Sequence, residues 1–201
     1  MTVIMGVLDK KNKCVHMMGD SLVSRGELKA LHINKIYKDN EFIIGGAGYL
    51  SILQLFKRSI NFPSEKQIEE NGIEINIDFM VNHLKPTINK IMKANSIEGF
   101  GEILIAYKDK LFTINTINSG HVFNIQDCTS TGTGMDFALS TYNNLNHIDN
   151  IEERLFKSIK SATDNIRSCE LPAYYINTKE MEFKEFNQEG QWKYVEQDEQ
   201  W

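Results

Sequence analysis

Apolar positions in the first half of the chain follow two patterns, one typical of strands and one typical of helices. Residues 2–48 contain two pairs of short apolar runs, each pair joined by a charged turn (DKKNK and KDNE), and predict two successive β-hairpins. Over 48–60 and 77–92 the apolar residues recur every three or four positions, which predicts amphipathic helices. Pro86 should kink or divide the second helix, and a loop is expected over 62–72.

The second half of the chain repeats this order of strands followed by helices. Residues 101–125 form near-continuous apolar runs with turn signals at KDK and NSG, which predicts three strands buried on both faces. Over 132–145 a glycine-rich loop leads into a helix, and a second helix follows with Asp149 or Asn150 as its N-cap. Residues 173–186 predict a final hairpin.

This order of elements predicts an α+β protein with four layers. Two mainly antiparallel sheets, each covered on its outer face by a helix pair, would bury every apolar stripe in an α-β-β-α sandwich. We expect one domain over 1–186, followed over 187–201 by a polar tail without a core pattern. Trp192 and Trp201 in that tail are candidates for contacts with another subunit or a partner.

Composition narrows the class of protein. With 201 residues, 41% of them hydrophobic, and a net charge of −5, the chain is a folded domain without the basic surface that nucleic acids or anionic membranes require. No uninterrupted apolar run reaches the roughly 20 residues of a membrane span. The N-terminal lysines follow the first apolar stretch, unlike those of a signal peptide, so we expect a cytoplasmic protein.

The common metal and nucleotide motifs are missing from the sequence. Three cysteines without C-x-x-C spacing indicate neither a disulfide framework nor a zinc ribbon. The five histidines show no H-E-x-x-H pattern, so we expect no metal and no cofactor. The strand–GGAG–helix turn is only a weak candidate for phosphate binding. The residues concerned are Cys14, Cys128, Cys169, His16, His32, His83, His121 and His147.

Thr2 is the first candidate for catalysis. Removal of Met1, which a small second residue permits, would leave a threonine with a free α-amine. That amine can act as the base that activates the residue's own hydroxyl. Its unperturbed pKa of about 7.7–8.0 leaves it substantially neutral at cellular pH. Thr2 could thus supply nucleophile and base together.

An ordered set of short motifs gives Thr2 a context. The set comprises T-V-I-M-G-V from residue 2, M-G-D at 18–20, N-K-I-Y at 34–37, G-G-A-G at 45–48 and G-T-G-M at 132–135. From about Thr2 to Thr178, the chain resembles the proteasome β-subunit family of N-terminal-nucleophile (Ntn) hydrolases. The resemblance lies in the order and spacing of these motifs and in their placement on expected strands and helices. The chain is most similar to the bacterial HslV branch of that family.

The resemblance implies a role for each matched residue. Thr2 would be the nucleophile and its amine the general base. Lys35 would face the threonine and lower the pKa of its hydroxyl and amine, while a salt bridge to Asp20 would fix the lysine in place. The backbone N–H of Gly48 would form the oxyanion hole. Thr133 stands where the family usually has a serine that hydrogen-bonds the α-amine.

The chain also departs from the family pattern. After the last core helix, Ile166 and Cys169 occupy the positions where proteasome subunits commonly have an aspartate and a serine. Asp164 could replace the aspartate if the alignment shifts.

The family pattern also indicates where the substrate would bind. In that pattern, the pocket for the residue before the scissile bond would be lined by Ile33, Tyr37 and Gly46. These residues imply cleavage after medium or large apolar side chains.

These implications together describe a cofactor-free threonine endopeptidase. Family members form ring-shaped homo-oligomers with inward-facing sites, which implies peptide or unfolded-protein substrates and makes an ATP-driven unfoldase a candidate partner. Two alternatives remain open at this point. The chain could be a catalytically silent structural subunit that retains Met1, or a small-molecule amidase on the same fold.

Overall fold

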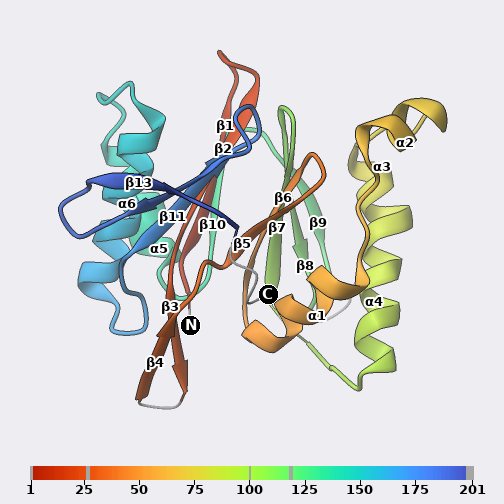
Figure 1. Cartoon of the computed structure of the whole chain (residues 1–201), viewed down its shortest axis with the longest axis horizontal. Helices are drawn as coiled ribbons and strands as arrows, with labels where there is room; N and C mark the ends of the chain where they lie inside the picture. Colours follow the sequence, from red (N-terminus) through yellow and green to blue (C-terminus); the bar gives the residue numbers. More distant parts are fainter. Residues whose placement is uncertain (1, 26–27, 100, 118–119, 198–201) are drawn as a thin grey trace.

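The protein folds into four layers in the order α-β-β-α (Figure 1). The computed structural model describes residues 2–25, 28–99, 101–117 and 120–197. Two antiparallel sheets stack face to face, and helices cover the outer face of each, so the expected fold class is confirmed. In the described part of the chain, no helix has the length and apolar composition of a membrane span.

The first sheet has six antiparallel strands in the order β10-β1-β2-β11-β12-β13. The expected N-terminal hairpin supplies its second and third strands, with Ile4 opposite Gly19 and Asp9 opposite Cys14. The strands are β1 (Ile4–Asp9), β2 (Cys14–Asp20), β10 (Cys128–Thr131), β11 (Ala173–Asn177), β12 (Phe183–Phe186) and β13 (Trp192–Val195).

The second sheet is an antiparallel meander in the order β5-β6-β7-β8-β9. It contains the second expected hairpin and the three expected strands of the central apolar block. Its strands are β5 (Ile36–Asp39), β6 (Phe42–Ala47), β7 (Glu102–Tyr107), β8 (Lys110–Asn115) and β9 (Val122–Ile125). A separate ribbon of β3 (Leu22–Arg25) and β4 (Leu28–His32) projects at the lower end in Figure 1.

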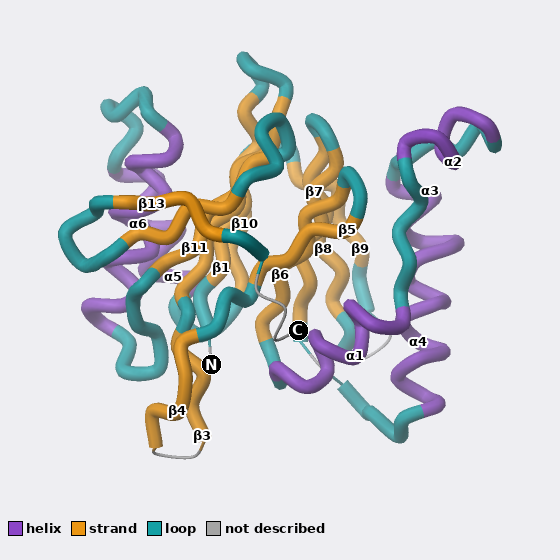
Figure 2. The backbone as a smooth tube through the Cα atoms, in the orientation of Figure 1, coloured by secondary structure: helices purple, strands orange, loops and turns teal. Residues whose placement is uncertain are grey.

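The helices form the two outer layers (Figure 2). On the side of the first sheet lie α5 (Met135–Asn144) and α6 (Ile151–Asn165), and Asn150 caps α6 by accepting a hydrogen bond from the Glu153 N–H. On the side of the second sheet lie α1 (Leu50–Ser59), α2 (Glu65–Glu70), α3 (Ile77–Phe79), a π-helical turn (Met80–Leu84) and α4 (Lys85–Ala94).

Pro86 divides its helix as expected, and it does so through the π-helical turn. Proline has no N–H to donate, so the regular hydrogen-bond pattern cannot continue through it. Immediately before it, the Lys85 N–H donates to the carbonyl of Met80, five residues back. Pro86 then occupies the first turn of α4, where a missing N–H costs nothing.

Five elements were not predicted from the sequence: β3, β4, α2, β10 and β13. Helix α2 buries no side chain and is instead started by a capping box, in which Ser64 and Gln67 bond each other's backbone N–H groups. Strand β10 is the polar sequence CTST, and β13 is a mostly exposed edge strand within the expected polar tail. None of these elements needs the apolar periodicity that a sequence pattern can reveal.

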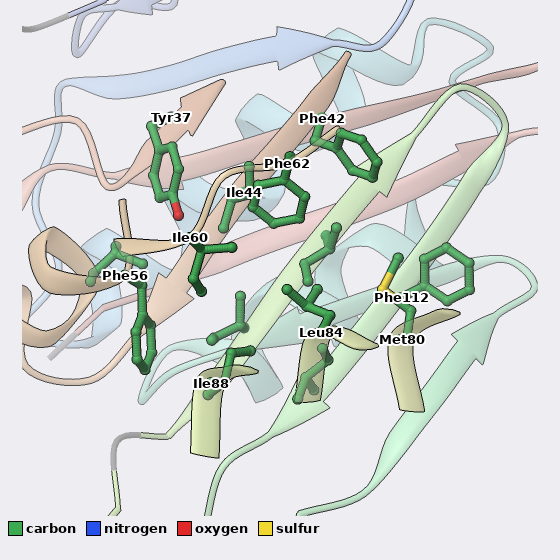
Figure 3. Close-up of a cluster of buried hydrophobic side chains, with 14 of the residues drawn as sticks. Tyr37, Phe42, Ile44, Phe56, Ile60, Phe62, Met80, Leu84, Ile88 and Phe112 are labelled. Atoms are coloured by element: carbon green, nitrogen blue, oxygen red, sulfur yellow. The ribbon is translucent and has the colours of Figure 1, made fainter. Parts of the chain in front are cut away.

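The core consists of three apolar layers, one between each pair of adjacent structural layers. The layer between the sheets is closely packed, because a Cβ on Gly45 would lie 2.9 Å from Met17 Sδ. A second layer joins the first sheet to α5 and α6. The third joins the second sheet to α1 and α4 (Figure 3), with Tyr37, Phe42, Phe56, Leu84 and Phe112 among its members.

Leu104→Ala should test the layer between the sheets. Leu104 is fully buried there, and close packing prevents the neighbours from filling the cavity. We expect a loss of about 2–5 kcal/mol in the free energy of unfolding, measured by chemical denaturation. Leu31→Ala, at a leucine that is 58% exposed, is the matched control and should change stability by less than about 0.5 kcal/mol. Equal losses in both variants would contradict this assignment of the core.

Candidate active site

Antiparallel pairing brings distant sequence motifs to one end of the two sheets. In the first sheet, β1 starts where β2 and β10 end, because Ile4 lies opposite both Gly19 and Thr131. In the second sheet, β5 starts where β6 ends, because Ile36 lies opposite Gly45. The residues that flank these strand ends therefore come together. They are Thr2, Asp20, Lys35, Gly48 and Thr133, the five positions matched in the sequence.

A buried ion pair forms the centre of this region. Lys35 Nζ lies 2.8 Å from Asp20 Oδ1, and the side chains are 5% and 0% exposed. Burial raises the pKa of the Asp20 carboxyl and lowers the pKa of the Lys35 ammonium, and the ion pair between them opposes both changes. Burial thus makes the Lys35 ammonium easier to deprotonate than that of a surface lysine, while the ion pair with Asp20 favours its charged form.

Asp20 connects four separate segments of the chain. Its Oδ1 accepts hydrogen bonds from Lys35 and from the Val3 N–H at 2.9 Å, and its Oδ2 accepts from the N–H groups of Leu22 at 3.2 Å and Glu170 at 3.3 Å. The Asp20 N–H in turn donates to the Val3 carbonyl at 3.0 Å. The carboxylate therefore fixes the backbone next to Thr2 as well as the lysine.

The glycine-rich loop after β10 holds the backbone of Thr2. The Thr2 carbonyl accepts a hydrogen bond from the Gly134 N–H at 3.3 Å. Gly132 has a φ of +94°, and any Cβ on it would collide with that carbonyl, so only glycine fits there. Thr133 Oγ1 lies 3.5 Å from the Thr2 carbonyl oxygen and from Ser168 Oγ, at the outer limit of hydrogen bonding.

The segment after α6 brings Cys169 to the site and leaves Asp164 outside it. Burial, followed by the Asp20 charge, raises the pKa of the Cys169 thiol to about 11, so the thiol stays neutral, and it interacts with the Thr133 side chain. Ile166 packs against the apolar layer under α6. Asp164 is exposed and pairs with Lys160 at 2.9 Å. Asp164 therefore does not replace the aspartate that the family pattern has after the last core helix.

A cleft of about 910 Å³ opens beside Thr2. Four of the matched residues contribute to its lining: Thr2, Lys35, Gly48 and Thr133. The rest of its described lining consists of Leu22, Val23, Ala47, Tyr49, Leu50, Gly101, Glu102, Asn115, Ile117, Thr129, Ser130, Thr131, Gly132 and Met135. Gly48, with a φ of +154°, forms the turn between β6 and α1 at this surface.

The three residues assigned to a specificity pocket do not line this cleft. Ile33 and Tyr37 are buried in the apolar layer between the second sheet and its helices, where Figure 3 shows Tyr37. Gly46 is buried within β6, opposite Ile103. The family resemblance implies that these residues line the substrate pocket, whereas the structure buries them in the core. The apolar lining comes instead from residues such as Leu22, Val23 and Leu50.

Comparisons with solved structures identify the architecture. The chain has the proteasome-like Ntn-hydrolase fold. It superimposes on the β-proteasome homologue BPH from Thiobacillus denitrificans, in two structures, with TM-scores of 0.66 and 0.65 and sequence identities of 13% and 15%. It superimposes on the eukaryotic HslV from Trypanosoma brucei with a TM-score of 0.64 and 17% identity.

These matches cover 87% of this chain and 96–98% of the others. The first of the BPH structures is a complex with epoxomicin. No protein-family model and no curated protein sequence matches the chain.

Glu102 also lines the cleft beside Thr2, and the sequence motifs did not reveal it. It starts β7 opposite Ala47 of β6 and Asn115 of β8, both of which also line the cleft. Among the described lining residues, only Glu102 and Lys35 carry charges. Burial raises the pKa of Glu102, although hydrogen bonds from Thr131 and Thr113 oppose the change. A charged residue at the start of the apolar run EILIAY was the only sequence signal.

Glu102→Gln is expected to stabilise the protein near neutral pH. Because its folded-state pKa is raised above the ordinary 4.5, the folded state binds this proton more tightly than the unfolded chain. Wild-type stability therefore falls as pH rises through the folded-state pKa, and glutamine removes that loss. Denaturation at about pH 7.5 should show a gain of under about 1 kcal/mol, because the open cleft screens the charge.

That gain should shrink as the pH falls through the raised folded-state pKa and vanish below about 4.5, where the glutamate becomes protonated in both states. The matched control is Glu74→Gln at an exposed glutamate, which should show no such trend. A gain that increases towards acid pH would refute the assigned direction of the pKa change.

Proposed function

We propose that the protein is a threonine peptidase whose nucleophile is Thr2, exposed by removal of Met1. One observation carries the proposal: Thr2 lies in the wall of a cleft together with Lys35, whose ammonium is held by the buried Asp20. Burying two charges costs several kcal/mol of desolvation free energy, so a role of the pair in chemistry would account for its position beside the cleft. Met1 itself lies outside the described residues.

The proposed reaction begins with the attack of Thr2 Oγ1 on a peptide carbonyl. The α-amine accepts the hydroxyl proton, and the positive charge of Lys35 favours the deprotonated forms of both groups. The Gly48 N–H stabilises the oxyanion. The amine then passes the proton to the leaving nitrogen, which breaks the peptide bond and leaves an ester on Thr2. Water, deprotonated by the amine, hydrolyses that ester.

Peptides and unfolded proteins are the proposed substrates. The BPH structure with epoxomicin shows a similar fold binding this peptide epoxyketone. The apolar side chains of Leu22, Val23 and Leu50 in the cleft favour cleavage after medium or large apolar residues. Equal turnover of acidic, basic and apolar fluorogenic peptides would count against this preference.

The proposed setting is a cytoplasmic ring-shaped homo-oligomer, with an ATP-driven unfoldase as a candidate partner. The similarity of fold to HslV and BPH supports assembly from copies of one chain. Trp192 is 46% exposed on the edge strand β13, where it packs against Tyr194 and Lys184. It remains our candidate for a contact with another subunit, whereas Trp201 lies outside the described residues.

A catalytically silent structural subunit is the second candidate function. The observation that favours it is the replacement of the late polar pair by Ile166, which is partly buried against the core, and Cys169, whose thiol is neutral. A silent subunit would assemble into a ring and retain Met1. A small-molecule amidase, the third alternative, would be recognised as a monomer or dimer.

Intact mass spectrometry with epoxomicin tests the nucleophile directly. An epoxyketone closes its ring on a hydroxyl and a free amine of the same residue, so only a processed Thr2 can react completely. We expect loss of the Met1 mass and one adduct per chain, with no adduct in Thr2→Ala and peptide turnover reduced by about 10³-fold or more. Retained Met1 without an adduct would favour the silent subunit. Wild-type turnover by Thr2→Ala would refute the mechanism.

A double-variant cycle tests whether the ion pair serves chemistry or only stability. Lys35→Met and Asp20→Asn alone should each lose activity and about 3–5 kcal/mol of stability, because each leaves a buried group without its partner. The combined variant should recover most of the stability, since no charge then remains buried. Its peptidase activity should stay at least about 10²-fold below wild type. Recovery of activity with stability would assign the pair a purely structural role.

A further inference from the structure

A second cluster of reactive side chains lies at the other end of the N-terminal hairpin. Asp9 ends β1, and Cys14 and His16 lie at the start of β2, whereas Thr2 and Asp20 mark the opposite end of the same two strands. The turn between these strands is at the top of Figure 1. At about 3.4 Å per strand residue, the cluster lies roughly 20 Å from the candidate active site.

Three different donor atoms converge in this cluster. His16 Nε2 lies 3.5 Å from Cys14 Sγ and 3.6 Å from Asp9 Oδ2. All three donor atoms lie within 4.8 Å of one another, with Asp9 and Cys14 buried and His16 half-buried. Cys14 and His16 share one face of β2 because they are two residues apart, and Asp9 is paired directly with Cys14 across the hairpin.

These separations resemble those between the ligands of a tetrahedral zinc ion. Zn–S and Zn–N bonds of about 2.3 and 2.0–2.1 Å at a tetrahedral angle place sulfur and nitrogen about 3.6 Å apart, and two lighter ligands about 3.3 Å apart. We propose that Asp9, Cys14 and His16 bind one Zn²⁺ ion. Zinc binding would release the thiol proton to water, and the resulting thiolate and the carboxylate together would neutralise the charge of the ion.

The surroundings fix two of the ligands for this role. His16 Nδ1 lies 2.6 Å from Tyr175 Oη, so the other ring nitrogen is already engaged and Nε2 faces the cluster. Histidine ligands of metals usually have their second nitrogen engaged in this way. Asp9 Oδ1 accepts from the N–H groups of Lys11 and Asn12 at 2.9 and 3.0 Å. Oδ2 accepts from Asn12 Nδ2 at 2.6 Å and lies 3.6 Å from His16 Nε2, and a carboxylate oxygen has a second lone pair for the ion.

The same geometry argues against a cysteine nucleophile. In a Cys-His-Asp triad, the thiol and the carboxylate contact opposite nitrogens of the imidazole. Here the sulfur and the carboxylate both approach Nε2, and Nδ1 belongs to Tyr175. Two ligand atoms beside the same imidazole nitrogen suit the binding of a cation, whereas proton transfer through the ring would need the thiol and the carboxylate at opposite nitrogens.

Three protein ligands leave one coordination position for a water molecule or a small anion. Asp9 and His16 line a surface pocket of about 670 Å³, which gives the ion a path from solvent. Five carboxylates and three cationic side chains line this pocket, so its excess of negative charge would attract a cation, although Glu152 is paired with Lys184 at 2.7 Å. The spacing D-x₄-C-x-H matches no standard zinc motif, which explains why the sequence indicated no metal.

The test uses the full-length protein, freed of metal with a chelator and titrated with Zn²⁺ or Co²⁺ alone. We expect one ion per chain, a higher Tm with zinc, and for cobalt the absorption of a tetrahedral site with a thiolate-to-metal charge-transfer band. Cys14→Ser should abolish that band, and Asp9→Asn should weaken binding at least about 10-fold. Tyr175→Phe, which removes the hydroxyl that contacts His16 Nδ1 and accepts from Asn177 Nδ2, should weaken binding by about 10–100-fold.

Two matched variants serve as controls, because they remove the same groups elsewhere. Cys128→Ser and His147→Gln should bind zinc as wild type does, since neither residue belongs to the cluster. Wild-type protein that binds no zinc, or that binds cobalt without a charge-transfer band, would overturn the proposal irrespective of how the variants fold. Unchanged binding by Cys14→Ser would place the ion elsewhere and would also overturn it. Peptidase activity is not a readout here, so the outcome is independent of Thr2.

Discussion

The buried ion pair between Asp20 and Lys35 is the constraint on which the candidate site depends. Desolvation of two charges costs several kcal/mol, and one hydrogen bond would not offset it. Asp20 therefore accepts from three backbone N–H groups as well as from Lys35. Those N–H groups belong to segments that surround Thr2, so the bonds that make the charge tolerable also position the residue that would use it.

The sandwich fold explains why such a network can be built from short motifs. In an antiparallel sheet, the starts and ends of successive strands alternate at one end of the sheet, so a chain that makes hairpins returns repeatedly to that end. Thr2, Asp20 and Thr133 flank strand ends of one sheet, and Lys35 and Gly48 flank strand ends of the other. The glycines in the layer between the two sheets allow the sheets to approach closely enough for these strand ends to share one cleft.

Much of this architecture could be predicted from the sequence, and the exceptions share a physical cause. The hairpins and the helices with apolar stripes were predicted because burial imposes a period on the sequence. Helix α2 and strand β13 were missed because capping and edge pairing stabilise them without such a period. The family resemblance implies a pocket position for Tyr37, whereas its side chain packs into the core, because a matched motif does not show which face of a strand meets the core. Glu102 escaped notice because no motif includes it.

The donor that Glu170 supplies to Asp20 has a consequence for the order of folding. Glu170 is separated from Asp20 by 150 residues, and the strand that follows it, β11, pairs with β2 along its length. A chain emerging from the ribosome without this segment lacks both the donor and the neighbour that covers β2. The arrangement of the candidate site would therefore form only after nearly the whole domain has been synthesised, so a nascent chain would carry the proposed nucleophile without the network proposed to activate it.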